Sequence, residues 1–575
     1  MHKTFATNNV LKRVVSFIIL PLVIEGLTVI LPSEKNLRNF NYLRLFFIFA
    51  VFLMLSIKKE SIGRQVALLF KRVSLLRERN VCKTVILGNL IYCICALTLY
   101  YLKHGTFYYG YVSVAICGAV IINALLLYVT KVIRSIETLF FLCSTSIVVA
   151  AIFSVPLYAN NGDAAKHFDR SIKLANVYVG VHFPQYSLEE QYSVEQLYKV
   201  ISYADSSVAF QDTLPWFSDF TLLSYRYIAY LPYCFGLVFA DALLLSPTAA
   251  YYAGVVSNAV FILYVYTCAM KKLRSGKLIL AAFVLLPFTI RLLRIYTYTA
   301  WVWVFLTYAA ATVIGIMQKD SPVTAKEMFA ILGSYMLAFF VKPPYFLMAA
   351  FAYLIPEKKF YSSKLKKRFG LSISLVIAAG IVLIILPALI SPIGFEMYSD
   401  IRGGSAVSAV GQLKYIFLNP IQYGILLVKT MLSDLSPDVL WFGPEGICNF
   451  RGGLLCDYAA FFPALLFMAL LLDRNEFEKD VLTWKNRLIS FGIVLLNSCI
   501  IATTMYMNYS EVGSSAIAGV SSLYYAAAFF PMLHMMGTKR IEFHGSKRVL
   551  NAVTIGSASL LLFYNVYIKF TSLMI

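Results

Sequence analysis

Long apolar runs recur along the whole chain, and they constrain its fold more than any other feature. Runs of about 17–25 residues are long enough to cross a hydrocarbon core of roughly 30 Å as a helix. Only 14% of the 575 residues are charged, whereas 60% are hydrophobic. Soluble domains carry about 25% charged residues. We therefore predict an all-α polytopic integral membrane protein with about fifteen spans.

The charges indicate how the chain is oriented. The net charge is +21, and the basic residues gather in short loops between apolar runs. Cytoplasmic loops of membrane proteins carry this bias, so the strongly basic segment 58–83 and the N-terminus are predicted to be cytoplasmic. Because the cations do not form one continuous face, no nucleic-acid partner is predicted. The pattern is typical of a multi-pass protein of the cell (plasma) membrane.

Alternating the spans along the chain gives two long extracytoplasmic regions, about 159–248 and 395–457. Among the predicted spans are 249–270, 278–293, 299–317, 345–355 and 523–536. The first part, 159–227, holds eight Asp and Glu against five Lys and Arg, which suits an outer loop. The apolar stretches 228–246 and 415–432 would break the alternation if they crossed. We therefore predict that both are re-entrant or interfacial.

The first outer loop opens with a carboxylate and an imidazole, Asp163 and His167, four residues apart. A carboxylate at the membrane surface is suited to take a proton from an acceptor or to orient it. Asp163 is also a favoured N-cap for a helix over 164–175, and the two roles are compatible. His167 lies one turn later on the same side, where it would bind phosphate, assist proton transfer, or only pack under the loop.

Three cations are predicted at the outer membrane surface. Lys342 precedes Pro343 and Pro344, and a lysine there suits a phosphate or pyrophosphate, although a snorkelling lysine at a helix end is the alternative. Arg291 and Arg294 lie at the outer end of a predicted span, against the charge rule, which favours a lipid-phosphate site.

Two further features receive no role. Glu25 lies in the middle of the first apolar run, where it is either functional or packed in protonated form. Cys448 and Cys456 share one outer loop, and their spacing allows either a disulfide or two free thiols.

Four short segments occur in a fixed order along the chain: Asn161-Gly162-Asp163-Ala164-Ala165-Lys166-His167-Phe168, Lys342-Pro343-Pro344-Tyr345, Gln412-Leu413 with Asn419-Pro420, and Val512-Gly513 with Ser522-Leu523-Tyr524. Their order resembles the bacterial DUF2142 membrane-protein family, which is similar to the GT-C glycosyltransferases. The family's second acidic position is Ala164 here, and its usual arginine is Leu523. Residues 1–136 have no counterpart, so we interpret them as extra N-terminal transmembrane helices before a GT-C-like domain over 137–575.

The resemblance implies a GT-C-like helix bundle whose large first outer loop contains short helices. It implies a glycosyltransferase that moves a sugar from a polyprenyl-phosphate donor to a cell-surface glycan or lipid-linked acceptor, with membrane lipids around it. Asp163 and His167 would be catalytic, and Lys342, Arg291 and Arg294 would hold the donor phosphate. A divalent metal fits such chemistry, but no residue spacing indicates a metal site.

Two other functions stay open. One is a flippase or transporter of lipid-linked oligosaccharide, which the absence of evident paired broken helices in the sequence disfavours. The other is a non-catalytic scaffold for envelope-polysaccharide assembly, which the departures at Ala164 and Leu523 favour.

Overall fold

The computed structural model describes most of the chain after residue 78, and within the described ranges every regular element is a helix. The predicted first two spans, with Glu25, lie outside these ranges. The chain divides into two compact units, Met1–Leu90 with Asn160–Asn258 and Ile91–Ala159 with Ala259–Ile575. The described residues are 79–104, 111–154, part of 164–175, 225–242, 247–390, 407–443, 446–450, 456–473, 481–537, 541 and 543–567.

The smaller unit contains η4 (Tyr225–Tyr230), α10 (Leu231–Ala242) and the start of α11 (Pro247–Lys272). The helix predicted over 164–175 is present at every described position of that range. It is held by Phe168, whose ring meets Tyr251 edge-on at 4.9 Å. Gly236 lets α10 approach α11 closely, because a Cβ there would stand 2.1 Å from the Ala253 carbonyl oxygen.

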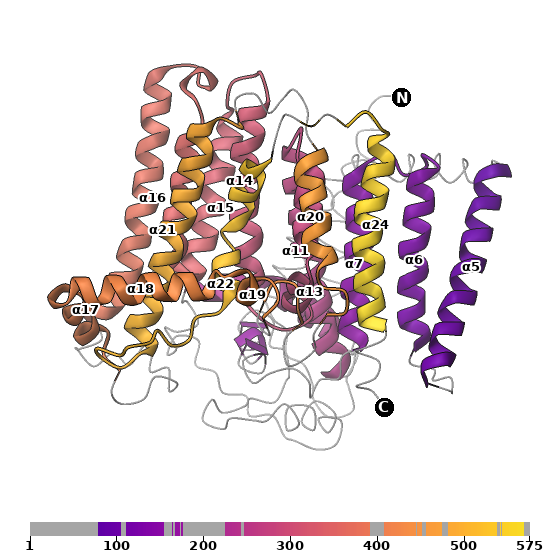
Figure 1. The fold of residues 1–575 in the computed structure, drawn as a ribbon, viewed down its shortest axis with the longest axis horizontal. Helices are drawn as coiled ribbons and strands as arrows, with labels where there is room; N and C mark the ends of the chain where they lie inside the picture. The colour runs from indigo at the N-terminus through magenta and orange to yellow at the C-terminus, as the bar shows by residue number, and fades with distance from the viewer. Residues whose placement is uncertain are drawn as a thin grey trace, which may run out of the picture. The chain divides into compact units, whose positions relative to one another are not determined.

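The larger unit is a bundle of helices in two groups (Figure 1). In one group α14, α15, α16 and α21 pack around η5. In the other, α6, α7 and α24 pack together. The groups are connected by α12, α20 and α23. Besides parts of α5 (Arg79–His104) and α11, its elements are α6 (Tyr111–Val129), α7 (Ile136–Ser154), α12 (Lys277–Val284), α13 (Pro287–Leu293), α14 (Thr299–Gln318), α15 (Ala325–Val341), η5 (Pro343–Leu354), η6 (Glu357–Lys359), α16 (Ser363–Ile390), α17 (Ala409–Leu418), α18 (Pro420–Asp434), α19 (Pro437–Leu440), α20 (Phe461–Leu472), α21 (Trp484–Tyr509), α22 (Ser522–Ala526), α23 (Phe529–Met536) and α24 (Lys547–Asn565).

The core of the larger unit forms around α14. In the apolar spanning part of α14, 94% of the residues are buried, whereas only 22% are buried in that of α16. Trp303 on α14 packs against Phe288 at 4.2 Å and stacks on Phe283 at 5.9 Å between ring centroids. The apolar side chains of α16 that remain exposed suit a lipid environment, since lipid tails are as apolar as leucine.

Six helices in the described part of the chain are long and apolar enough to cross a membrane, and a bent pair would make a seventh. This confirms the prediction of an all-α polytopic membrane protein. The six are Val81–Thr98, Ile136–Ser154, Ala249–Lys272, Thr299–Gln318, Ser363–Ile384 and Trp484–Tyr509.

Two segments that the sequence predicts as single spans are broken. The range 278–293 divides into α12 and α13 because Pro287, at the first turn of α13, cannot donate a backbone hydrogen bond to α12. The range 523–536 divides into α22 and α23. The two broken segments lie side by side, with the Phe283 and Phe530 rings 6.2 Å apart.

A third departure follows Lys342, where the predicted return span 345–355 is a 3₁₀ helix, η5, of 12 residues. Runs of this helix type are usually only three or four residues long. Pro343 and Pro344 occupy its first turn, where the missing N–H groups do least harm.

The stretch 415–432, predicted to be re-entrant or interfacial, forms α17 and α18, which meet at 108°. Figure 1 shows α18 lying across the direction of α16 and α21. Its exposed side chains Ile421, Ile425, Val428 and Leu432 recur at helical spacing and form one apolar stripe. A helix of this kind suits the membrane interface.

One end of the larger unit is basic, and we call it the basic end. The loops 130–135, 271–277, 319–326 and 356–368 meet there. Lys277 pairs with Glu137 at 2.5 Å, the side-chain oxygen of Gln318 accepts from the Arg274 N–H at 2.8 Å, and the Val323 N–H donates to the Lys359 carbonyl at 2.7 Å. These contacts join neighbouring loops at one end of the larger unit.

Candidate functional site

Lys342 stands at the opposite end of the larger unit, which we call the motif end. The preceding helix α15 starts at the basic end with a capping box of Thr324 and Glu327 and runs 17 residues, or about 25 Å, to Val341. The backbone leaves the helix at Lys342. Its ammonium lies over the Tyr524 ring, 3.2 Å from the centroid, and 6.0 Å from that of Tyr298.

Three of the segments that carry the family resemblance meet at the motif end. The Tyr345 hydroxyl donates to the Tyr524 carbonyl at 2.6 Å, which joins the Lys-Pro-Pro-Tyr segment to the segment ending Leu523-Tyr524. The side-chain oxygen of Gln412 accepts from the Gly513 N–H at 3.0 Å, which joins the third segment to the same stretch. Gly513 has a φ of 77°, a conformation that favours glycine.

Arg291 and Arg294 lie in and directly after α13, and both are buried, with 3% and 7% of their surface exposed. The helix α13 packs against α7 and α14. Arg294 lies a few residues before Tyr298, whose ring is near the Lys342 ammonium. The three predicted phosphate ligands therefore share the motif end. Burying a guanidinium group is costly unless it meets acceptors or an anion.

His167 belongs to the smaller unit and contacts a tyrosine that the sequence analysis did not select. Its Nδ1 lies 2.6 Å from the Tyr230 hydroxyl, which the 3₁₀ helix η4 positions. Asp163 lies outside the described residues. The catalytic roles of Asp163 and His167 remain predictions.

The structure adds one acidic residue to the candidate site. Asp434 ends α18, and its carboxylate accepts from the Tyr525 hydroxyl at 3.1 Å. Tyr525 is fully buried and adjoins Tyr524, whose ring Lys342 covers. Burial raises the pKa of Asp434, although the hydrogen bond from Tyr525 opposes this. Sequence reasoning missed this residue because a lone carboxylate at the end of an amphipathic stretch carries no spacing signal.

The loop after α19 contains both outer cysteines, and they are free thiols in the structure. Cys448 and Cys456 are both buried. Burial and the nearby Cys456 raise the pKa of the Cys448 thiol. Asn449 orders the loop, since its side-chain oxygen accepts from the Cys456 N–H at 2.9 Å. In the part of the chain that the structure describes, no group of three His, Cys, Asp or Glu side chains is placed to hold a metal ion.

The fold defines the class, an all-α polytopic membrane protein whose distinctive site lies at one end of its helices. Residues 189–536 match the model of the family described as predicted membrane protein (DUF2142). This match covers more than half of the chain, so the protein belongs to the DUF2142 family. No curated protein and no solved structure matches the chain. Lys342, Arg291, Arg294 and Asp434 lie inside the matched range, whereas Asp163 and His167 precede it.

Proposed function

We propose that this protein is a glycosyltransferase that moves a sugar from a polyprenyl-phosphate donor to a cell-surface glycan or lipid-linked acceptor. The observation that carries the proposal is Lys342 on the Tyr524 ring, where three of the family-like segments meet, in the same unit as two buried arginines. By the positive-inside rule, the basic end faces the cytoplasm. The motif end then faces outward across the plasma membrane, and the N-terminus is cytoplasmic.

The reaction needs three things from the site. An acceptor hydroxyl attacks the anomeric carbon, the bond from that carbon to the phosphate oxygen breaks, and polyprenyl phosphate leaves. Lys342, Arg291 and Arg294 bind the donor phosphate and stabilise the charge on the leaving group. A carboxylate receives the proton of the acceptor. Asp163, assisted by His167, is the first choice for this base.

Asp434 is the second choice for the base. Its raised pKa suits proton transfer. Its hydrogen-bond partner Tyr525 directly follows Tyr524, whose ring Lys342 covers. Asp434 and Asp163 can be separated by mutation, because they come from different outer regions.

Donor binding tests the phosphate site directly. The full-length protein in nanodiscs would be offered a polyprenyl monophosphate or the uncharged polyprenol, and retained lipid would be counted by native mass spectrometry. We expect preference for the phosphate, and a loss of about tenfold in Lys342→Met. The control is Lys414→Met, which removes an exposed cation from α17. Equal retention of both lipids, or an equal loss in the control, would contradict the phosphate site.

Catalysis is tested in cells that lack the protein. Wild type, Asp163→Asn and Asp434→Asn would be restored at equal expression, and surface glycans and lipid-linked sugars compared by mass spectrometry. We expect Asp163→Asn to abolish a glycan feature that the wild type restores. Loss only in Asp434→Asn assigns the base to that residue. Full restoration by both variants would refute carboxylate catalysis at either position.

A flippase is the second candidate, because two broken segments, α12–α13 and α22–α23, lie side by side. Transporters often bind substrates where helices are interrupted. Sealed proteoliposomes containing a polyprenyl-phosphate sugar distinguish the two functions. Movement of the lipid between leaflets without a new glycosidic product favours the flippase, whereas product formation favours the transferase.

A further inference from the structure

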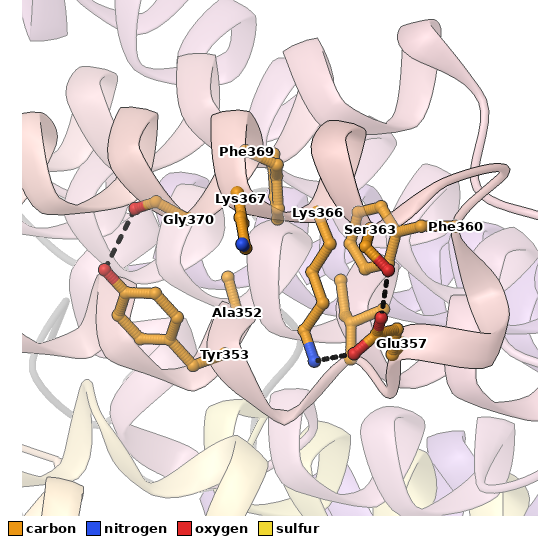
Figure 2. Close-up of a pocket in the computed structure, with 10 residues that line it drawn as sticks. Ala352, Tyr353, Glu357, Phe360, Ser363, Lys366, Lys367, Phe369 and Gly370 are labelled. Atoms are coloured by element: carbon orange, nitrogen blue, oxygen red, sulfur yellow. Dashed lines mark hydrogen bonds and ion pairs between the residues drawn. The ribbon is translucent and has the colours of Figure 1, made fainter.

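A recess lies at the basic end of the larger unit, far from Lys342. It has a volume of about 310 Å³ and is formed by the end of η5, by η6 and by the first turns of α16 (Figure 2). Lys342 begins η5 and the recess lies at its other end, so a 3₁₀ helix of 12 residues, about 24 Å long, separates them. We call this recess the basic pocket.

One wall of the basic pocket is cationic. Lys366 and Lys367 project from α16, and Figure 2 shows Lys366 reaching across to Glu357 on the facing wall. That ion pair measures 3.5 Å, and Ser363 donates a hydrogen bond to the same carboxylate. Within the described ranges Lys367 forms no ion pair. The segment 357–368 holds six Lys and Arg against one Glu, so the positive charge is far from balanced.

The other walls are apolar and lead onto the lipid-facing side of α16. Ala352 and Phe369 are buried and line the pocket, and Tyr353, half exposed, closes it by donating to the Gly370 carbonyl at 3.0 Å. The next turns of α16 present Leu371 and Leu375, each 61% exposed. A ligand here meets cations at one side and an apolar helix face at the other.

We propose that the basic pocket binds the phosphate headgroup of an anionic phospholipid, whose acyl chains lie along the exposed face of α16. The size suits a headgroup, since ligand pockets start at about 300 Å³. Anionic lipids concentrate on the cytoplasmic leaflet and are attracted by clustered lysine and arginine, and pockets between spanning helices bind such headgroups. The apolar walls favour a lipid over a soluble anion. This site is independent of the proposed glycosyltransferase.

The experiment compares two double variants with equal loss of charge on the same helix. Lys366→Gln/Lys367→Gln removes both pocket cations, whereas Lys364→Gln/Arg368→Gln removes two exposed cations outside the lining. Full-length proteins from nanodiscs that mix phosphatidylglycerol and phosphatidylcholine would be released into the gas phase, and bound lipids counted by native mass spectrometry. Melting in pure phosphatidylcholine checks that both variants fold. Removing Lys366 leaves the Glu357 carboxylate in contact with water. The loss of this exposed ion pair costs little folding stability.

We expect the wild type and the Lys364→Gln/Arg368→Gln control to retain phosphatidylglycerol selectively. The pocket variant should retain about tenfold less, since each basic residue near an anionic surface contributes substantially to its attraction. Equal losses in both variants would show diffuse attraction and overturn the pocket. No loss in the pocket variant would also overturn it.

A final arm separates the lipid from a soluble anion. Inorganic phosphate would be titrated into detergent-solubilised protein without phospholipid, and melting temperature measured. We expect no stabilisation that depends on Lys366 and Lys367. A phosphate-dependent rise that the pocket variant alone lacks would assign the pocket to a soluble anion and refute the lipid.

Discussion

The two ends of the larger unit treat their cations differently. At the basic end, Lys277 pairs with Glu137 at 2.5 Å and Lys319 with Glu327 at 2.6 Å, so carboxylates neutralise these two ammonium groups. At the motif end, Lys342 lies on the Tyr524 ring at 3.2 Å. An aromatic face attracts a cation without cancelling its charge. The comparison teaches that the first set of cations joins helices through ion pairs, whereas Lys342 packs on an aromatic ring.

The largest effect is expected when a paired cation is removed from the basic end. Lys277→Met leaves the Glu137 carboxylate, with 10% of its side chain exposed, without its partner. Breaking a buried pair costs about 3–5 kcal/mol, so we expect a large drop in thermal stability in nanodiscs. Arg274→Met is the control, because its pair with Asp320 is exposed and is worth less than about 1 kcal/mol. Equal drops would mean that burial does not distinguish these pairs.

The motif end is tested by changing the ring under Lys342. Tyr524→Leu removes the aromatic face, and a cation–π contact is worth about 1–2 kcal/mol when desolvated. We expect roughly tenfold weaker retention of polyprenyl monophosphate, because Lys342 is no longer held in place. Tyr524→Phe keeps the ring and should bind as the wild type does. If both variants weaken binding equally, the hydroxyl rather than the ring positions Lys342.

A smaller effect on folding stability is expected from the titration of the Asp434 carboxyl group. Burial raises its pKa in the folded protein. A carboxyl with a raised pKa contributes most stability below its unfolded pKa of about 3.9, and this contribution is lost as pH rises through the folded pKa. Solvent around the half-exposed group keeps the effect below about 1 kcal/mol. Melting of wild type and Asp434→Asn above pH 4 should therefore diverge as pH rises. Parallel curves would contradict the shift.

The smallest effect is expected at the exposed rim of the basic end. Hydrogen bonding from Ser363 and the charge of Lys366 lower the pKa of Glu357. Its contribution to stability is therefore present above the ordinary glutamate pKa of about 4.3 and is lost as pH falls through the folded value. Glu357→Gln should change the melting temperature least of the four substitutions, and only above that range. A drop comparable to that of Lys277→Met would remove the distinction between buried and exposed pairs.

Helix positions were largely predictable from the sequence, because a long apolar run in a membrane forms a spanning helix. The span predicted over 299–317 is α14, and the one over 249–270 is α11, each within a few residues. The break between α12 and α13 was not predicted, because Leu285 and Leu286 continue the apolar run and hydropathy does not register a change of direction. The prediction that 415–432 is re-entrant or interfacial rested on the alternation of charged loops between spans rather than on hydropathy.

The candidate site was predicted only in part. The end of helix α15 at Lys342 is determined by neighbouring residues in the sequence, and the two prolines after Lys342 predict it. Its partner Tyr524 and the contact between Gln412 and Gly513 join distant segments, and no single-sequence pattern encodes such pairings. Asp434 becomes a candidate only through the fold, since Tyr525 and burial give it its character.

The 3₁₀ helix η5 has a mechanical consequence. With a rise of about 2.0 Å per residue, its 12 residues extend about 24 Å, whereas an α-helix of the same residues would extend about 18 Å. The segment is thus an extended connection between Lys342 and the basic pocket. Rewinding it as an α-helix would draw its two ends about 6 Å closer, and would change the distance between Lys342 and the basic pocket accordingly.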